Sequence, residues 1–225
     1  MIRPLDLASI TKLKKIMRRI IVLSTVFFLA IGLKAQEPKS LSLNLYGGYN
    51  FKDKVNFDAS YGYVNEAFQY GAGLEYFPAR NKSFELRWLG MGTEFPFHGP
   101  SGTQLNVGKD KGSINYILLG GNSYFGNDPK AKALPYFGAG LGVGILALKD
   151  GNSETHFAWD AKLGVKIKTA SAVSINLHAY VQSIIAAVGY DYYYYPGWGT
   201  TAFTDYASIF QFGLGGAVSF NFKKK

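Results

Sequence analysis

Apolar and polar residues alternate one by one along most of the chain after residue 40. The clearest stretch, 157–168, sets Phe157, Trp159 and Leu163 on one side. Asp160 and Lys162 fall on the other side of the same stretch. A period of two is typical of β-strands whose two faces meet different surroundings. The segments around 173–181 and 210–222 repeat this pattern, which predicts an all-β fold.

Eight such segments are predicted as strands: 41–50, 68–77, 83–93, 112–125, 133–148, 155–168, 172–188 and 206–222. Each segment reaches the roughly 9–11 residues that a tilted strand needs to cross a bilayer. The pattern is less clear in two of them. In 112–125 apolar residues fall on both faces, and in 133–148 glycines interrupt the alternation.

The connections between these segments fall into two length classes. Long connections (51–67, 94–111 and 189–205) alternate with short ones (78–82, 126–132 and 169–171), and 149–154 is the exception. Short periplasmic turns and longer outer loops are typical of up-and-down membrane barrels. The expected fold is therefore an up-and-down antiparallel transmembrane β-barrel of eight strands.

The N-terminal part has the features of an export signal. Arg18 and Arg19 precede an apolar run that ends near Ala35. Fourteen helical residues span only about 21 Å, too short for a hydrocarbon core of about 30 Å. We therefore expect a signal peptide over residues 1–35, in which 1–16 is an over-long start because Met17 makes a more usual one. Residues 36–225 then form one barrel domain.

The basic character of the chain is concentrated in that leader. Removing residues 1–35 takes seven of the 24 basic and one of the 15 acidic residues, so the net charge falls from +9 to +3. The remaining charge gives no reason to expect nucleic acid as a partner. The chain has no cysteine, which excludes thiolate metal sites, disulfides and a lipid anchor on cysteine. No cofactor, metal or catalytic residue is expected.

The alternating segments and the last strand together resemble the small outer membrane β-barrel proteins of the OmpA-like and OmpX-like, porin-related kind. The most specific piece is the end of the last strand, where Phe220 and Phe222 are followed by three lysines. The resemblance implies that this strand is the signal read by the outer membrane assembly machinery. It also implies a location in the bacterial outer membrane, in contact with its lipid and lipopolysaccharide.

The alternation alone also fits a secreted barrel of lipocalin type, in which the apolar face points inward. Two features favour the membrane barrel. The apolar faces are rich in aromatic residues, too many for the lumen of eight strands. The opposite faces carry many glycines, which suits a narrow interior. These glycines are Gly71, Gly73, Gly138, Gly140, Gly142, Gly144, Gly213 and Gly215.

The same parity places several charged residues in the lumen. They are Glu75, Glu85, Arg87, Asp160, Lys162 and Lys166, together with His178. Ions in so narrow a space must pair, because an unpaired buried charge costs several kcal/mol. We expect a plug of ion pairs and hydrogen bonds with neighbouring amides. The alternative is a gated ion path.

The histidines and an aromatic loop also bear on function. The three histidines could serve a lipid-modifying enzyme, but His178 and Ser174 share the predicted lumenal face, where lipid does not reach. The loop 189–205 is rich in aromatics, including Tyr192, Tyr193, Tyr194, Tyr195 and Trp198. These residues fit an aromatic girdle at the lipid headgroups or a recognition surface. Tyr76, Phe77, Tyr136 and Phe222 are expected to form the girdle on the other side.

The expected function is a structural or surface-interaction role through the outer loops, with a possible extracellular ligand. A narrow pore for small solutes is the alternative, and a lipid-modifying enzyme is a more remote one.

Overall fold

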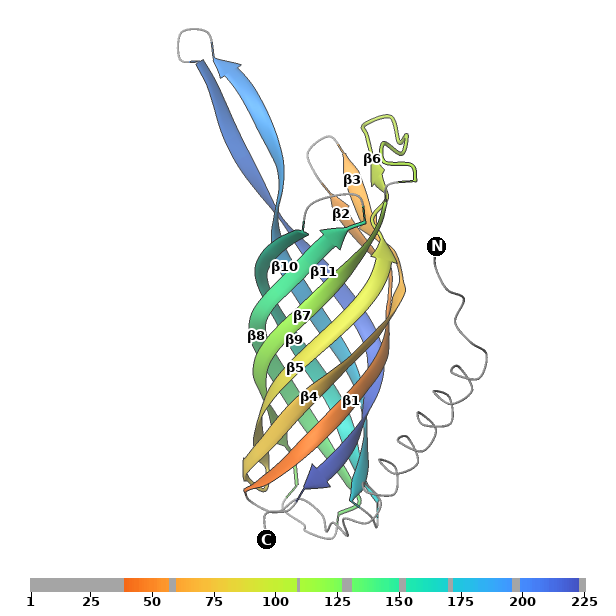
Figure 1. The fold of residues 1–225 in the computed structure, drawn as a ribbon, viewed down its shortest axis with the longest axis vertical. Helices are drawn as coiled ribbons and strands as arrows, with labels where there is room; N and C mark the ends of the chain where they lie inside the picture. The colour runs from red at the N-terminus through yellow and green to blue at the C-terminus, as the bar shows by residue number, and fades with distance from the viewer. Residues whose placement is uncertain are drawn as a thin grey trace, which may run out of the picture.

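The computed structural model describes residues 39–56, 60–108, 110–126, 131–149, 153–169, 172–195 and 199–222, and within 186–207 it describes the backbone only. Eight antiparallel strands form a closed barrel (Figure 1). They are β1 (Ser40–Asn50), β4 (Ala67–Ala79), β5 (Lys82–Glu94), β7 (Lys111–Tyr124), β8 (Ala133–Leu148), β9 (Ser153–Lys168), β10 (Val173–Tyr195) and β11 (Gly199–Phe222).

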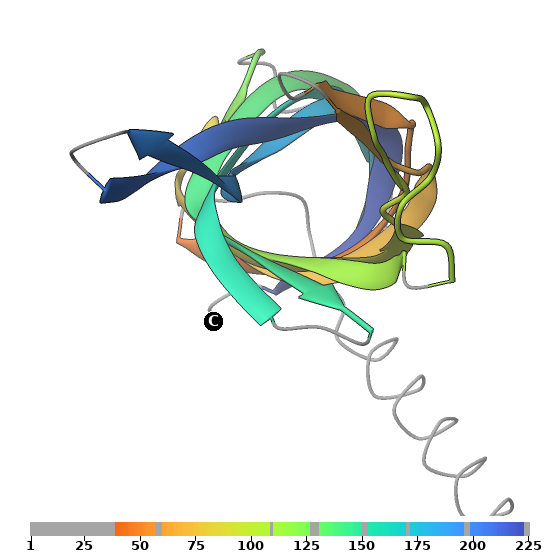
Figure 2. The same cartoon turned by 90° about the horizontal axis from the view of Figure 1, so that it is seen from above.

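Each strand pairs with the next one along the chain, and the last strand pairs with the first. Leu41 of β1 lies opposite Phe222 of β11, and Asn50 lies opposite Gly213. Seen from above, the strands form a ring (Figure 2). The predicted all-β, up-and-down barrel of eight strands is therefore confirmed. No helix among the described residues is long and apolar enough to cross a membrane.

The two ends of the barrel differ. At one end, here called the turn end, short connections join β4 to β5, β7 to β8 and β9 to β10. At the other end, the extended end, the chain continues beyond the ring (Figure 1). The three connections predicted as long all lie at the extended end.

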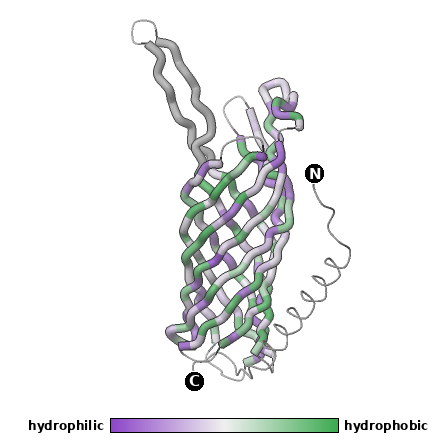
Figure 3. The backbone as a smooth tube through the Cα atoms, viewed as in Figure 1, coloured by the Kyte–Doolittle hydropathy of each residue, from purple (hydrophilic) through white to green (hydrophobic). Residues whose placement is uncertain are grey.

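Apolar side chains cover the outside of the barrel. Phe68 is 77% exposed, Phe84 64% and Leu163 64%, whereas the polar side chains between such residues are buried. Figure 3 shows the resulting alternation of hydrophobic and hydrophilic positions along the strands. A lipocalin-type barrel would have the reverse arrangement, so the apolar face points outward as the sequence predicts.

Two of the predicted loops contain β-structure. Segment 51–67 contains β2 (Asp53–Asn56) and β3 (Tyr61–Val64), and segment 94–111 contains β6 (Phe97–His98). These strands form a separate sheet in the order β2-β3-β6, here called the outer sheet. The loop prediction was wrong for them because each strand is too short to show an alternating pattern, while Asp, Asn and Gly nearby indicate turns.

The third predicted loop, 189–205, is also mostly strand. β10 continues to Tyr195 and β11 begins at Gly199, and the two remain paired after both have left the ring. This outer hairpin rises above the rest of the molecule in Figure 1. The prediction of a loop was wrong here, because the tyrosines and threonines of this segment favour strands. A register shift between Ala187 and Tyr190 marks the place where the hairpin leaves the barrel.

Candidate functional site: the barrel interior

The six charged residues assigned to the lumen come from three strands. β4 supplies Glu75, β5 supplies Glu85 and Arg87, and β9 supplies Asp160, Lys162 and Lys166. All six are buried, with 5% or less of each residue exposed. Residues an even number apart on a strand face the same side, so the two residues on β5 and the three on β9 all point inward.

Glu85 holds the largest group of contacts. Its Oε2 accepts from Arg87 Nη1 at 2.9 Å and from Lys162 Nζ at 2.8 Å. Its Oε1 accepts from Asn44 Nδ2 at 2.7 Å and from the Tyr46 hydroxyl. Arg87 also forms an ion pair with Asp160 on the far side of the lumen. One carboxylate thus links β1, β5 and β9.

Glu75 forms a second group nearer the turn end. Its carboxylate accepts from Ser83 Oγ at 2.5 Å, Asn122 Nδ2 at 2.8 Å and the Tyr124 hydroxyl at 2.6 Å. Lys166 Nζ lies 3.8 Å from Glu75 Oε2 and has no hydrogen-bond partner among the described residues. It lies over the ring of Phe77, 4.8 Å from the centroid, where a cation–π contact stabilises the charge.

Charge balance explains how these groups can share one interior. Glu75 and Glu85 are directly opposite each other on β4 and β5, an arrangement that is destabilising for like charges. With Asp160 they make three acidic groups, and Arg87, Lys162 and Lys166 supply three basic ones. Each charge therefore has an opposite charge nearby, which a buried ion requires.

Glycines on the facing strand positions make room for these long side chains. A Cβ on Gly140 would lie 2.6 Å from Arg87 Nη2, and one on Gly138 would lie 2.7 Å from Lys162 Cε. A Cβ on Gly213 would lie 2.4 Å from the ring of Tyr180. Gly138 and Gly140, two of the glycines that blur the alternation in β8, are thus placed beside charged side chains of the lumen.

An apolar layer closes the interior toward the extended end. Its buried members include Leu89, Met91, Ile114 and Ile184, and Val64 of the outer sheet belongs to the same cluster. The alternating pattern did not predict this layer. The apolar residues on both faces of 112–125 could have indicated it, because Ile114, Tyr116 and Leu118 point inward.

A second apolar layer closes the turn end. It consists of Phe77, Tyr124, Leu134 and Tyr136, all of them 4% exposed or less. Phe77 and Tyr136 were expected in a lipid-facing girdle, and this expectation was wrong because both point into the barrel. Tyr76, by contrast, is 44% exposed on the outer face. The parity of β4 explains the difference, because neighbouring residues of a strand face opposite sides.

A small cavity lies between the two layers. Its volume is about 20 Å³, and Tyr46, Arg87, Asp160 and Tyr180 are among the residues that line it. This is room for one or two water molecules at most. Arg87 Nε and the Tyr180 hydroxyl have no hydrogen-bond partner in the described part of the chain, so ordered water is their natural partner.

The histidines lie in three different surroundings. His178 is half-buried in the lumen, with Nδ1 3.0 Å from the Tyr136 hydroxyl. His156 Nε2 lies 3.0 Å from Glu154 Oε2 near the start of β9. His98 belongs to the outer sheet and stacks on Tyr61. Each of the three thus has a different neighbour, and His178 contacts a tyrosine rather than Ser174.

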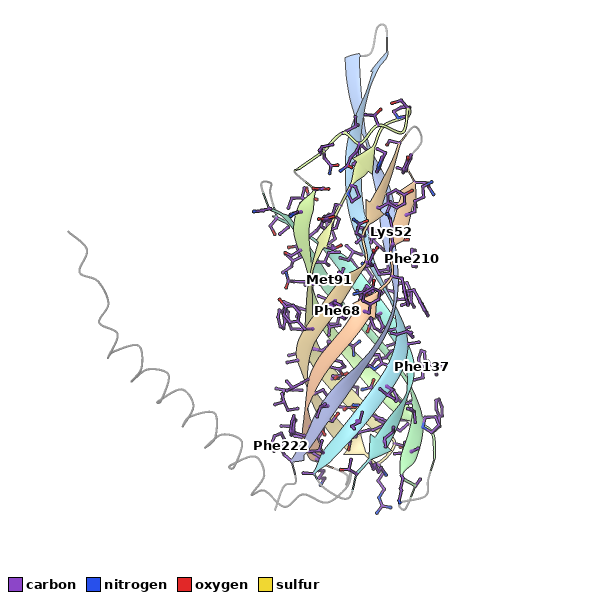
Figure 4. The ribbon with its side chains drawn as sticks, turned by 90° about the vertical axis from the view of Figure 1, so that its right-hand side faces the viewer. Lys52, Phe68, Met91, Phe137, Phe210 and Phe222 are labelled. Atoms are coloured by element: carbon purple, nitrogen blue, oxygen red, sulfur yellow. The ribbon has the colours of Figure 1, made fainter. Side chains whose placement is uncertain are left out.

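The other predicted residues lie in β10 and β11. Tyr192, Tyr193, Tyr194 and Tyr195 occupy consecutive positions in the outer hairpin, where Tyr192 pairs with Ala202 and Tyr194 with Thr200. Trp198 lies outside the described residues. Phe220 and Phe222 lie opposite Leu43 and Leu41 in the last strand, and Figure 4 shows Phe222 at the turn end. Their role in assembly stays a prediction, as does the signal peptide, which also lies outside the described residues.

No protein-family model matches the sequence, and no curated protein is significantly similar to it. Solved structures do resemble the barrel. Neisserial surface protein A matches with a TM-score of 0.55 and 11% identity over 81% of this chain and 97% of its own. The outer membrane protein OprG from Pseudomonas aeruginosa matches with a TM-score of 0.52 and 13% identity, over 85% and 100%. The chain therefore has the fold of the small eight-stranded outer membrane β-barrels.

Proposed function

We propose that this chain is an outer membrane barrel that does not conduct solutes and that acts at the cell surface through its extended end. The observation that carries the proposal is the filled interior. Three acidic and three basic side chains neutralise one another, and apolar layers lie on both sides of them. An ion that entered would have to displace these pairs and cross both layers.

Location in the outer membrane is supported by the apolar outer face and by the fold. Short connections at one end and extensions at the other correspond to the periplasmic and external sides of membrane barrels. In this orientation the outer sheet and the outer hairpin face the exterior. A surface-interaction role follows from the amount of chain that lies beyond the ring.

The rival functions make different demands on the structure. A pore needs a continuous water-filled path, and the cavity between the two layers is too small for one. A lipid-modifying enzyme needs a nucleophile and a base on the outer wall near the rim. His178 instead contacts Tyr136 inside the barrel.

Planar-bilayer recording tests the proposal. The full chain, inserted in a bilayer, is expected to give no stepwise current. Insertion is verified separately by the gel-mobility shift between heated and unheated samples. Discrete, reproducible channels from the unaltered protein would overturn the proposal in favour of a pore. A changed lipid A mass spectrum in cells that express the protein would favour the enzyme.

A further inference from the structure

The outer sheet has two unlike faces. Val55 and Val64 pack toward the apolar layer that closes the extended end. The opposite face presents the side chains of Lys54, Tyr61 and Tyr63. His98 of β6 lies on the same face as Tyr61, because the two residues are directly paired. One face thus closes the barrel, and the other is open to the surroundings.

Two lysines of the open face are held over aromatic rings. Lys52 Nζ lies 4.1 Å from the centroid of Tyr63, and Lys54 Nζ lies 4.5 Å from that of Tyr61. The ring of His98 stacks on Tyr61 with centroids 4.9 Å apart and planes 6° apart. Cation–π contacts restrict otherwise flexible lysine side chains. The two rings are neighbours, with centroids 5.6 Å apart, so the two ammonium groups lie over adjacent rings. We call this arrangement the Lys–Tyr patch (Lys52, Lys54, Tyr61, Tyr63 and His98).

The part of the chain that the structure describes places no negative partner beside the Lys–Tyr patch. No acidic side chain among the described residues forms an ion pair with Lys52 or Lys54. Asp53 lies between them in sequence but points to the other face, where its Oδ2 accepts from the backbone N–H of Phe210. Two exposed ammonium groups close together, with hydroxyl and imidazole groups beside them, match the charge and hydrogen-bonding of a phosphate.

The position of the Lys–Tyr patch relative to the apolar outer face of the barrel indicates the source of such a phosphate. Directly before Lys52, Phe51 stacks on Phe212 at 5.9 Å, and Tyr49 contacts Phe68 at 5.3 Å. Figure 4 shows Lys52 just beyond Phe210 and Phe68, toward the extended end. Aromatic side chains gather at the headgroup level of a membrane. A lysine one step beyond them lies at the level of the lipid phosphates.

We infer that the Lys–Tyr patch binds the phosphate groups of a lipid headgroup in the outer leaflet. This inference rests on the proposed location in the outer membrane and adds a specific lipid contact to it. The ligand is a membrane lipid rather than a free anion, because Phe51 and Phe68 would contact its acyl chains while the lysines contact its phosphates.

The test uses the full chain in detergent micelles and purified lipid A that carries both phosphates, with bound lipid counted by native mass spectrometry. The variant K52Q/K54Q is expected to bind lipid A at least tenfold more weakly than the unaltered chain, since each lysine near an anionic lipid surface contributes measurably. The matched control is K111Q/K149Q, which removes the same charge from two exposed lysines at the same end of the barrel. It is expected to change binding less than twofold.

Other arms separate the alternatives. Lipid A without phosphates is expected to bind like the K52Q/K54Q variant, and inorganic phosphate is expected not to compete. Y63F is expected to lower the affinity less than Y63L does, because Y63F removes the hydroxyl alone, whereas Y63L also removes the ring under Lys52. Equal losses in K52Q/K54Q and K111Q/K149Q, or full competition by inorganic phosphate, would overturn the inference. Failure of the chain to insert in bilayers would instead overturn the proposed function.

Discussion

At the scale of single residues, each buried charge depends on a partner that another strand supplies. Lys162 of β9 reaches Glu85 of β5 at 2.8 Å, and Arg87 of β5 reaches Asp160 of β9. Such contacts fix the register of the strands, because a slip by one residue would turn the charged side chains toward lipid. The cost of breaking one is therefore larger than for an ion pair at a protein surface.

Replacing Lys162 by Met tests the charge balance. In this variant Glu85 loses one of its two cationic partners, while Glu75 still lies opposite it. We therefore expect the free energy of unfolding to fall by about 3–5 kcal/mol. Urea titration in lipid vesicles measures the change. The control K82M, at an exposed position of β5, is expected to shift stability by about 0.5 kcal/mol or less.

Adding E85Q to K162M should recover part of the lost stability, because it removes the unbalanced carboxylate. Equal stability of K162M and K82M would show that the lumenal charges do not depend on one another.

Gly213 and Gly47 form a matched pair for the packing of the interior. A Cβ on Gly213 would meet the Tyr180 ring at 2.4 Å, whereas one on Gly47 would meet nothing within 4 Å. We expect G213A to lower the free energy of unfolding by about 1–3 kcal/mol and G47A to leave it nearly unchanged. The same urea titration compares them, and equal effects would contradict the filled interior.

Parity along the strands predicted which charged residues point inward, because it depends only on counting by two. The same counting places Phe77, two residues after Glu75, and Tyr136, two residues before Gly138, on the inward face, although their aromatic rings suggested a girdle. Counting could not predict that these side chains pack into apolar layers, because that packing depends on the neighbouring strands. The partners of Glu85 were equally beyond the sequence, since they depend on the order in which strands approach across the lumen.

At the scale of elements, the outer hairpin differs from the rest of the barrel. Pairing between β9 and β10 ends at Phe157 and Ile185, and pairing between β1 and β11 ends at Asn50 and Gly213. Beyond these points β11 accepts from Phe51 N–H at Phe212 O and donates from Phe210 N–H to Asp53, and among the described residues the remaining strand pairing is between β10 and β11. Two strands by themselves are marginally stable in water, so the hairpin adds little to the stability of the barrel.

Replacing residues 188–205 by Asn-Gly tests this independence. The dipeptide favours the tight turn that a two-residue hairpin needs. We expect the shortened chain to fold, to keep the heat-dependent gel shift and to change its free energy of unfolding by about 1 kcal/mol or less. Loss of folding would show that the hairpin is part of the barrel's core structure.

The alternating pattern located all eight barrel strands because each one separates lipid from lumen over many residues. It failed in the connections for a physical reason. β2 and β3 have four residues each and β6 has two, too few to show a period. The outer part of β10 and β11 lies beyond the ring, where the strands no longer separate lipid from lumen and nothing of that kind imposes an alternation.

At the scale of the whole molecule, the outer apolar face and the balanced interior depend on each other. The apolar exterior is stable only in contact with lipid, and in lipid the backbone of a strand must be fully paired, which a closed barrel achieves. Closing eight strands leaves an interior that side chains can fill. The polar residues excluded from the lipid face then occupy that interior, and they must neutralise one another.

The central claim is that the outward apolar face contacts lipid. Because the chain has no cysteine, a single cysteine can carry a spin label at Leu86, Phe212 or Lys54. In lipid vesicles, labels at 86 and 212 are predicted to be more accessible to dissolved oxygen than to a water-soluble nickel chelate, and the label at 54 is predicted to show the reverse. Greater accessibility of 86 and 212 to the nickel chelate would contradict the account.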